Sequence, residues 1–104
     1  MSAFAAAVDV IFADPNLGLE ARYLARGLGG GIPVQVIRRA PDQLAEFNGG
    51  RMVVGTVLID VRVSQVAELS NRDRFVIGSV TYEVSGDPVR DAEGLVWKAQ
   101  ARAL

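Results

Sequence analysis

Four acidic side chains lie close together near the end of the chain, and residues of this type could bind a cation or transfer protons. Glu83, Asp87, Asp91 and Glu93 offer carboxylate oxygens, which hard cations such as Ca²⁺ prefer as ligands. Their spacing does not follow an EF-hand loop, and Arg90 stands among them. We therefore interpret this segment as a solvated turn. No carboxylate pair stands out as catalytic, and no metal or cofactor is expected.

A glycine-rich segment, Gly27-Leu28-Gly29-Gly30-Gly31, could let backbone N–H groups approach a phosphate. Nucleotide-binding loops need a G-x-G-x-x-G spacing or a Lys-Ser/Thr pair, followed in each case by a helix. Neither pattern occurs here, and Pro33 with a predicted strand comes next. A flexible turn is the favoured interpretation.

The composition excludes much of enzyme chemistry. The 104 residues include no cysteine and no histidine, which removes disulfides, thiolate nucleophiles, most zinc sites and the usual general base near neutral pH. With 11 basic and 12 acidic residues the net charge is -1, so binding to nucleic acid through bulk charge is not expected. The first residues lack a secretory signal, and residues 53–59, the longest apolar stretch, are far short of the roughly 20 that span a membrane. A soluble cytoplasmic protein without a membrane partner is expected.

Charge is nevertheless uneven along the chain. Residues 22–51 carry five arginines against two acidic residues, a local charge of about +3, whereas residues 83–93 carry about -3. Complementary patches can join copies of a chain head to tail, in a contact that closes into a ring. An ordinary mixed surface explains the same pattern equally well.

The chain begins with a pattern typical of an amphipathic helix at about residues 2–13. Its apolar side chains recur at helical spacing, at Phe4, Val8, Ile11 and Phe12. A helix of about three turns is marginal alone in water. This apolar stripe must therefore pack on the protein's own sheet or on a neighbouring subunit.

From about residue 20 the apolar period changes from 3.6 to two, which indicates strands. Alternating runs occupy residues 21–25, 34–39, 57–63, 75–77, 80–84 and 95–101. Gly78-Ser79 predicts a hairpin with a type II′ turn, residues 86–94 predict a polar turn, and residues 40–52 predict a long loop. Tyr82 and Trp97 fall on apolar strand faces and are expected in the core, not on a base-stacking platform.

These elements predict a mainly β (α+β) fold, namely a small antiparallel β-barrel or sandwich with a short N-terminal helix and one long loop. Residues 1–104 are expected to form a single domain, whose β part spans about residues 20–104.

The order of the elements resembles that of a known family. The resemblance rests on Ile11-Phe12-Ala13-Asp14-Pro15-Asn16-Leu17, on Asp73-Arg74-Phe75-Val76-Ile77-Gly78-Ser79-Val80-Thr81-Tyr82-Glu83-Val84, and on the closing strand around Trp97. The chain is similar to the phage head-tail joining proteins: the lambda head-tail attachment protein family and the related stoppers of siphophages and gene transfer agents. The similarity covers most of the chain and is strongest from Val57 onward.

The resemblance implies a structural protein of the virion neck that performs no catalysis. It implies a homo-oligomeric ring, hexameric or dodecameric in the particle, and a monomer in isolation would agree with it. The ring would bind beneath the portal and adaptor after DNA packaging, close the channel and present a surface to the tail terminator.

The resemblance also implies two sets of site residues. Residues 40–52 would project into the channel, and the residues facing DNA or neighbouring subunits would be Arg38, Arg39, Gln43, Phe47 and Arg51. The helix would dock on a partner through Phe4, Val8, Ile11 and Phe12.

Two other interpretations stay open. One is a tail terminator or another tail component, which is also a β-rich ring former. The other is a small β-barrel that binds a small molecule or nucleic acid. An enzyme is the least favoured class.

Overall fold

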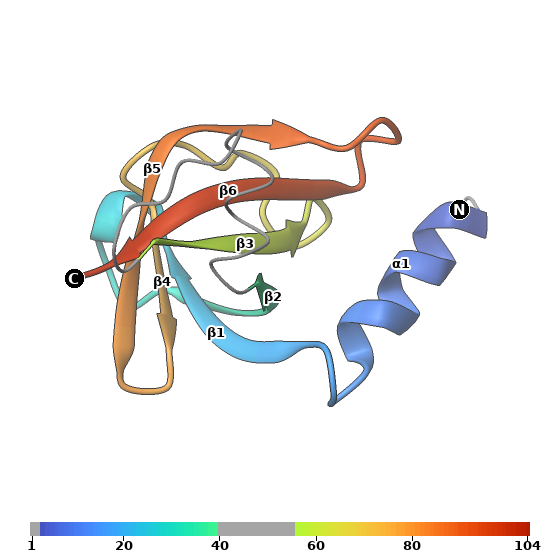
Figure 1. Ribbon diagram of the computed structural model, residues 1–104, viewed down its shortest axis with the longest axis horizontal. Helices are drawn as coiled ribbons and strands as arrows, with labels where there is room; N and C mark the ends of the chain where they lie inside the picture. The colour runs from blue at the N-terminus through green and yellow to red at the C-terminus, as the bar shows by residue number, and fades with distance from the viewer. Residues whose placement is uncertain (1–2, 40–55) are drawn as a thin grey trace.

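Strands make up about half of the described residues, and they close into a barrel. The computed structural model describes residues 3–39 and 56–104. In chain order the elements are α1 (Ala3–Ala13), β1 (Leu19–Leu24), the 3-10 helix η1 (Ala25–Gly27), β2 (Ile32–Arg39), β3 (Thr56–Arg62), β4 (Arg74–Ile77), β5 (Val80–Arg90) and β6 (Val96–Ala103). All neighbouring strands are antiparallel, in the order β1-β2-β3-β6-β5-β4, with β4 pairing back onto β1 (Figure 1). The predicted mainly β fold with an N-terminal helix is confirmed, and of the two predicted architectures the barrel is the correct one.

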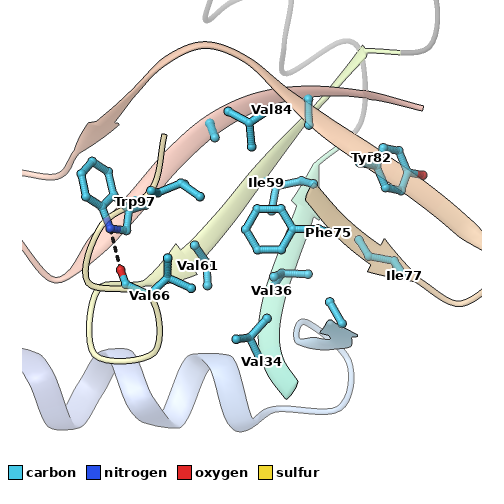
Figure 2. Packing of buried hydrophobic residues seen from close by; sticks show 14 residues of the cluster. Val34, Val36, Ile59, Val61, Val66, Phe75, Ile77, Tyr82, Val84 and Trp97 are labelled. Atoms are coloured by element: carbon cyan, nitrogen blue, oxygen red, sulfur yellow. Dashed lines mark hydrogen bonds between the residues drawn. The ribbon is translucent and has the colours of Figure 1, made fainter. Parts of the chain in front are cut away.

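The core fills the inside of the barrel with one face of each strand, as the period of two requires. Figure 2 shows this packing around Phe75, which is completely buried. Tyr82 and Trp97 belong to the same cluster, so their predicted place in the core is confirmed. The indole Nε1–H of Trp97 donates a hydrogen bond to the Val66 carbonyl at 2.8 Å, which satisfies the one polar group of that side chain.

The hairpin between β4 and β5 forms where the sequence places it. Ile77 pairs with Val80, so the connection has two residues, Gly78 and Ser79. Gly78 has a φ of 61° and Ser79 does not have a positive φ, which is the pattern of a type II′ turn. Glycine is needed at the first of these positions because other residues rarely adopt that conformation.

The polar turn predicted for residues 86–94 is shorter than expected. β5 continues to Arg90, because a shift of register between Ser85 and Val89 lets pairing with β6 resume beyond Gly86. Gly86 has a φ of 76° within this irregularity. The turn proper is closed by Asp91, whose Oδ1 accepts hydrogen bonds from the backbone N–H groups that follow it.

The first predicted strand also ends sooner than the alternation suggests, because η1 begins at Ala25. The glycine-rich segment after it is a turn, as predicted, with positive φ at Gly27, Gly29 and Gly31. The long loop predicted at residues 40–52 lies outside the described residues.

Candidate assembly surface

Helix α1 is attached to the barrel near its C-terminal end and projects away from it at the N-terminal end (Figure 1). The attachment centres on Phe12, which is only 3% exposed. The guanidinium of Arg62, from β3, lies 5.3 Å from the centre of the Phe12 ring, within the range of a cation–π contact. The same guanidinium forms an ion pair with Asp9, with Nη1 and Oδ1 3.0 Å apart.

Arg62 joins the helix to two strands of the barrel. Its Nη2 donates a 2.7 Å hydrogen bond to Oε1 of Gln35 on β2. The backbone N–H of Gln35 in turn donates to Oε1 of Gln65 at 2.9 Å. One largely buried arginine thus fixes α1 relative to β2 and β3, and the sequence offers no local signal for it, because Asp9 lies 53 positions away.

The turn after α1 sets the direction of the helix. Oδ1 of Asp14 accepts a 2.8 Å hydrogen bond from the Asn16 N–H, and the Asp14 carbonyl accepts one from Gly18 at 2.8 Å. A Cβ at Gly18 would lie 2.1 Å from the Phe12 carbonyl oxygen, so no other residue fits this close return of the chain. The helix therefore leaves the barrel at a fixed angle.

The other large apolar residues of the helix pack less completely on the barrel than Phe12 does. Phe4 is 61% exposed, Val10 71% and Ile11 45%, while Val8 is half-buried over a cavity of about 130 Å³. The predicted stripe thus divides: Phe12 packs on its own barrel, and Phe4 and Ile11, seven positions apart on one side of the helix, face solvent. Clustered exposed apolar side chains are typical of protein interaction sites.

The two arginines at the end of β2 point to opposite faces of the barrel wall, as alternation requires. Arg39 is on the outside and donates a hydrogen bond to Oδ2 of Asp60. Burial raises the pKa of Asp60, an effect that the Arg39 hydrogen bond and the charge of Lys98 partly offset. Arg38 is exposed at the end of the barrel and donates to the Tyr82 hydroxyl at 3.1 Å.

Within residues 3–39 and 56–104 Arg38 contacts the Tyr82 hydroxyl and ring but forms no ion pair, whereas Arg39 is paired with Asp60. Gln43, Phe47 and Arg51, the other predicted channel residues, lie outside the described residues.

The four carboxylates considered above as a cation site are not brought together. Glu83 forms an ion pair with Arg74, and Asp91 closes the β5–β6 turn. Within residues 3–39 and 56–104 no group of three or more acidic residues is placed to hold a metal ion.

A closed antiparallel barrel of six strands with one N-terminal helix defines the described part of the chain as a small, mainly β fold. The family model described as Phage Head-Tail Attachment protein matches residues 1–101. The chain therefore belongs to the phage head-tail attachment family, and the family resemblance predicted from the sequence is confirmed. No curated protein and no solved structure matches the chain.

Membership of this family makes the chain a structural component of the phage head-tail junction, whose partners are other head and tail proteins. In the part of the chain that the structure describes, no helix has the length and apolar character needed to cross a membrane.

Proposed function

We propose that the chain is a stopper of the virion neck. Its copies form a ring beneath the portal and adaptor, close the DNA channel after packaging and provide the surface on which the tail is joined. The observation that carries this proposal is the exposed apolar side of α1, with Phe4 and Ile11.

Burying such side chains gives a favourable contribution to assembly. Complete burial of a large apolar side chain is worth about 1.5–3 kcal/mol, so two half-exposed ones supply about 2–3 kcal/mol per subunit. The Arg62 contacts already fix the helix, which reduces the conformational entropy lost on docking. Repeated around a ring, a contribution of this size favours a closed assembly over single subunits.

The channel side of the ring is proposed to be the end of the barrel where β2 finishes. Arg38 is exposed there and forms no ion pair with another described residue, so it is the better candidate for a DNA contact than Arg39, which is paired with Asp60. Gln43, Phe47 and Arg51 complete the proposed channel-facing set.

The test is a phage that lacks this chain and is complemented with variants of it. Without the chain we expect heads that lose their packaged DNA and do not join tails, as seen by electron microscopy. The double variant Phe4→Ser/Ile11→Ser should behave in the same way while remaining folded, because both side chains are exposed.

Leu28→Ser is the matched control, since Leu28 is 72% exposed but lies near η1 and not on α1. It should support tail joining. Tailed, infectious particles formed without the chain would end the proposal, and accumulation of the chain in headless tails would indicate a tail terminator instead.

A further inference from the structure

A second candidate binding surface lies at the end of the barrel opposite to α1, beside η1 and the C-terminus (Figure 1). Four arginines surround an open cavity of about 640 Å³ there, together with Asn71 and Glu83. The arginines are Arg26, Arg72, Arg74 and Arg102. We call these four residues and their cavity the arginine pocket.

The arginine pocket carries positive charge that the described part of the chain does not neutralise. Glu83 accepts hydrogen bonds from Nε and Nη2 of Arg74, both at 3.2 Å. Within the described residues no ion pair or hydrogen bond engages the guanidinium groups of Arg26, Arg72 and Arg102. Four guanidinium groups against one carboxylate leave three positive charges around one cavity.

A buried carboxylate holds the two segments that carry these arginines. Asp73 is 2% exposed, and its Oδ1 accepts a 2.8 Å hydrogen bond from the backbone N–H of Arg26. Its Oδ2 accepts from the Ser70 N–H at 2.9 Å and from the Tyr23 hydroxyl at 2.6 Å. Burial and the neighbouring Asp73 raise the pKa of Tyr23, so this hydroxyl stays protonated and donates. The walls of the pocket are therefore fixed to each other.

The backbone adopts unfavourable conformations to place two of the arginines. Arg26 has a φ of 56° and Arg72 a φ of 75°, and among the described residues no other non-glycine residue has a positive φ. Such a conformation is unfavourable for a residue with a Cβ, and glycine would avoid that cost. Both of these residues are arginines of the same pocket. This indicates that the pocket needs their guanidinium groups in spite of the unfavourable backbone conformation.

Gly27 makes room for a third arginine. It has a φ of 73°, and a Cβ there would lie 2.9 Å from Cδ and Nε of Arg74. The Arg74 side chain therefore lies directly against the backbone of η1, where it remains bound to Glu83.

We propose that the arginine pocket binds phosphate groups, either free or in a nucleic-acid backbone. Guanidinium forks bind phosphate in a bidentate manner, and a tetrahedral phosphate offers enough acceptor oxygens for several of them at once. A carboxylate offers two oxygens, and Glu83 already supplies one carboxylate to the pocket. The cavity volume of about 640 Å³ exceeds that of one phosphate group, so adjacent groups of a phosphodiester chain also fit. This inference does not rest on ring formation, because the pocket lies away from α1.

The test titrates the full chain with inorganic phosphate, with a short DNA duplex and with oligoglutamate of the same charge as the duplex, followed by NMR amide shifts. We expect phosphate and DNA to shift the amides around the pocket, and DNA to bind in a salt-dependent manner. A response to phosphate alone would assign free phosphate as the ligand, and tighter binding of DNA would assign nucleic acid.

Two variants separate binding from folding. Arg72→Gly removes a guanidinium and also the unfavourable φ, so DNA affinity should fall about tenfold while the Tm is unchanged or higher. Arg102→Gln should also weaken binding and reduce the salt slope by about one. Arg90→Gln removes one charge outside the pocket, from the far end of β5, and should change affinity less than twofold.

Three results would overturn the proposal. One is the absence of shifts at the pocket with either phosphate ligand. Another is an effect of Arg90→Gln as large as that of Arg72→Gly, which would indicate unspecific attraction by charge. The third is oligoglutamate binding as tightly as DNA, which would assign the pocket to an acidic protein segment.

Discussion

Replacing Arg62 by methionine tests whether this side chain holds α1 on the barrel. Its hydrogen bond to Gln35 joins β3 to β2, so it persists when the helix separates and does not count toward the docking of α1. Its ion pair with Asp9 adds only about 0.5 kcal/mol, since the Asp9 side chain is 48% exposed. The contact with the Phe12 ring adds about 0.5–1 kcal/mol. The two helix contacts together are worth about 1–1.5 kcal/mol, so Arg62→Met should weaken the docking of α1 by that amount.

Native-state hydrogen exchange measures this loss where it occurs. The amides of α1 should exchange about 5- to 10-fold faster in Arg62→Met, because the helix can separate while the barrel core stays intact. Amides of β3 and β6, which lie in the most extensive strand pairing, should keep their protection. Arg102→Met is the control, since it removes an arginine from the opposite end of the barrel and should leave α1 unchanged.

Two outcomes would refute this account. Unchanged exchange in α1 would mean that Phe12 alone holds the helix. Equally faster exchange in the barrel would mean that helix and barrel unfold as one cooperative unit, so that Arg62 stabilises the whole fold.

Further predictions concern a glycine and a buried acid. Gly27→Ala should lower the free energy of unfolding by about 0.5–1 kcal/mol more than Gly29→Ala in chemical denaturation, because both have a positive φ but only at Gly27 must the Arg74 side chain shift away from Glu83; equal losses would contradict the close approach. Burial raises the pKa of Asp60 in the folded state above its unfolded value, so its contribution to stability is greatest below the unfolded pKa and is lost as the pH rises through the folded pKa. Relative to Asp60→Asn, the protein should therefore become less stable from about pH 3 to pH 6, and a rise over that range would show that the Arg39 hydrogen bond outweighs burial.

The fold was predictable wherever short-range chemistry determines it. Gly78-Ser79 between two alternating runs specifies a hairpin because the turn conformation depends on those two residues alone. Tyr82 and Trp97 could be assigned to the core because alternation along a strand is itself the barrel's inside–outside pattern. The end of β5 was not predictable in this way, since pairing beyond Gly86 depends on what β6 offers opposite it.

The features that build the sites depend on partners far apart in sequence. Phe4, Val8, Ile11 and Phe12 share a helical stripe, but only the position of Arg62 shows that Phe12 faces the barrel while Phe4 faces solvent. The sequence around Asp73 does not indicate its buried hydrogen bonds either, because its partner Tyr23 lies 50 positions away. The arginine pocket was not predicted for a different reason. Arg26 and Arg72 adopt a positive φ, and a sequence pattern assigns that conformation to glycine and not to arginine.

Closure of the barrel has a consequence for how the protein can accumulate before it is needed. Because β4 pairs back onto β1, the described strands leave no free strand edge of the kind that recruits further chains by backbone hydrogen bonding. Runaway strand-by-strand polymerisation is thereby disfavoured during infection, when many copies are present together. Copies of the protein must therefore associate through side chains on their surfaces. Single substitutions can strengthen or weaken such contacts, so assembly can evolve without a change in the sheet.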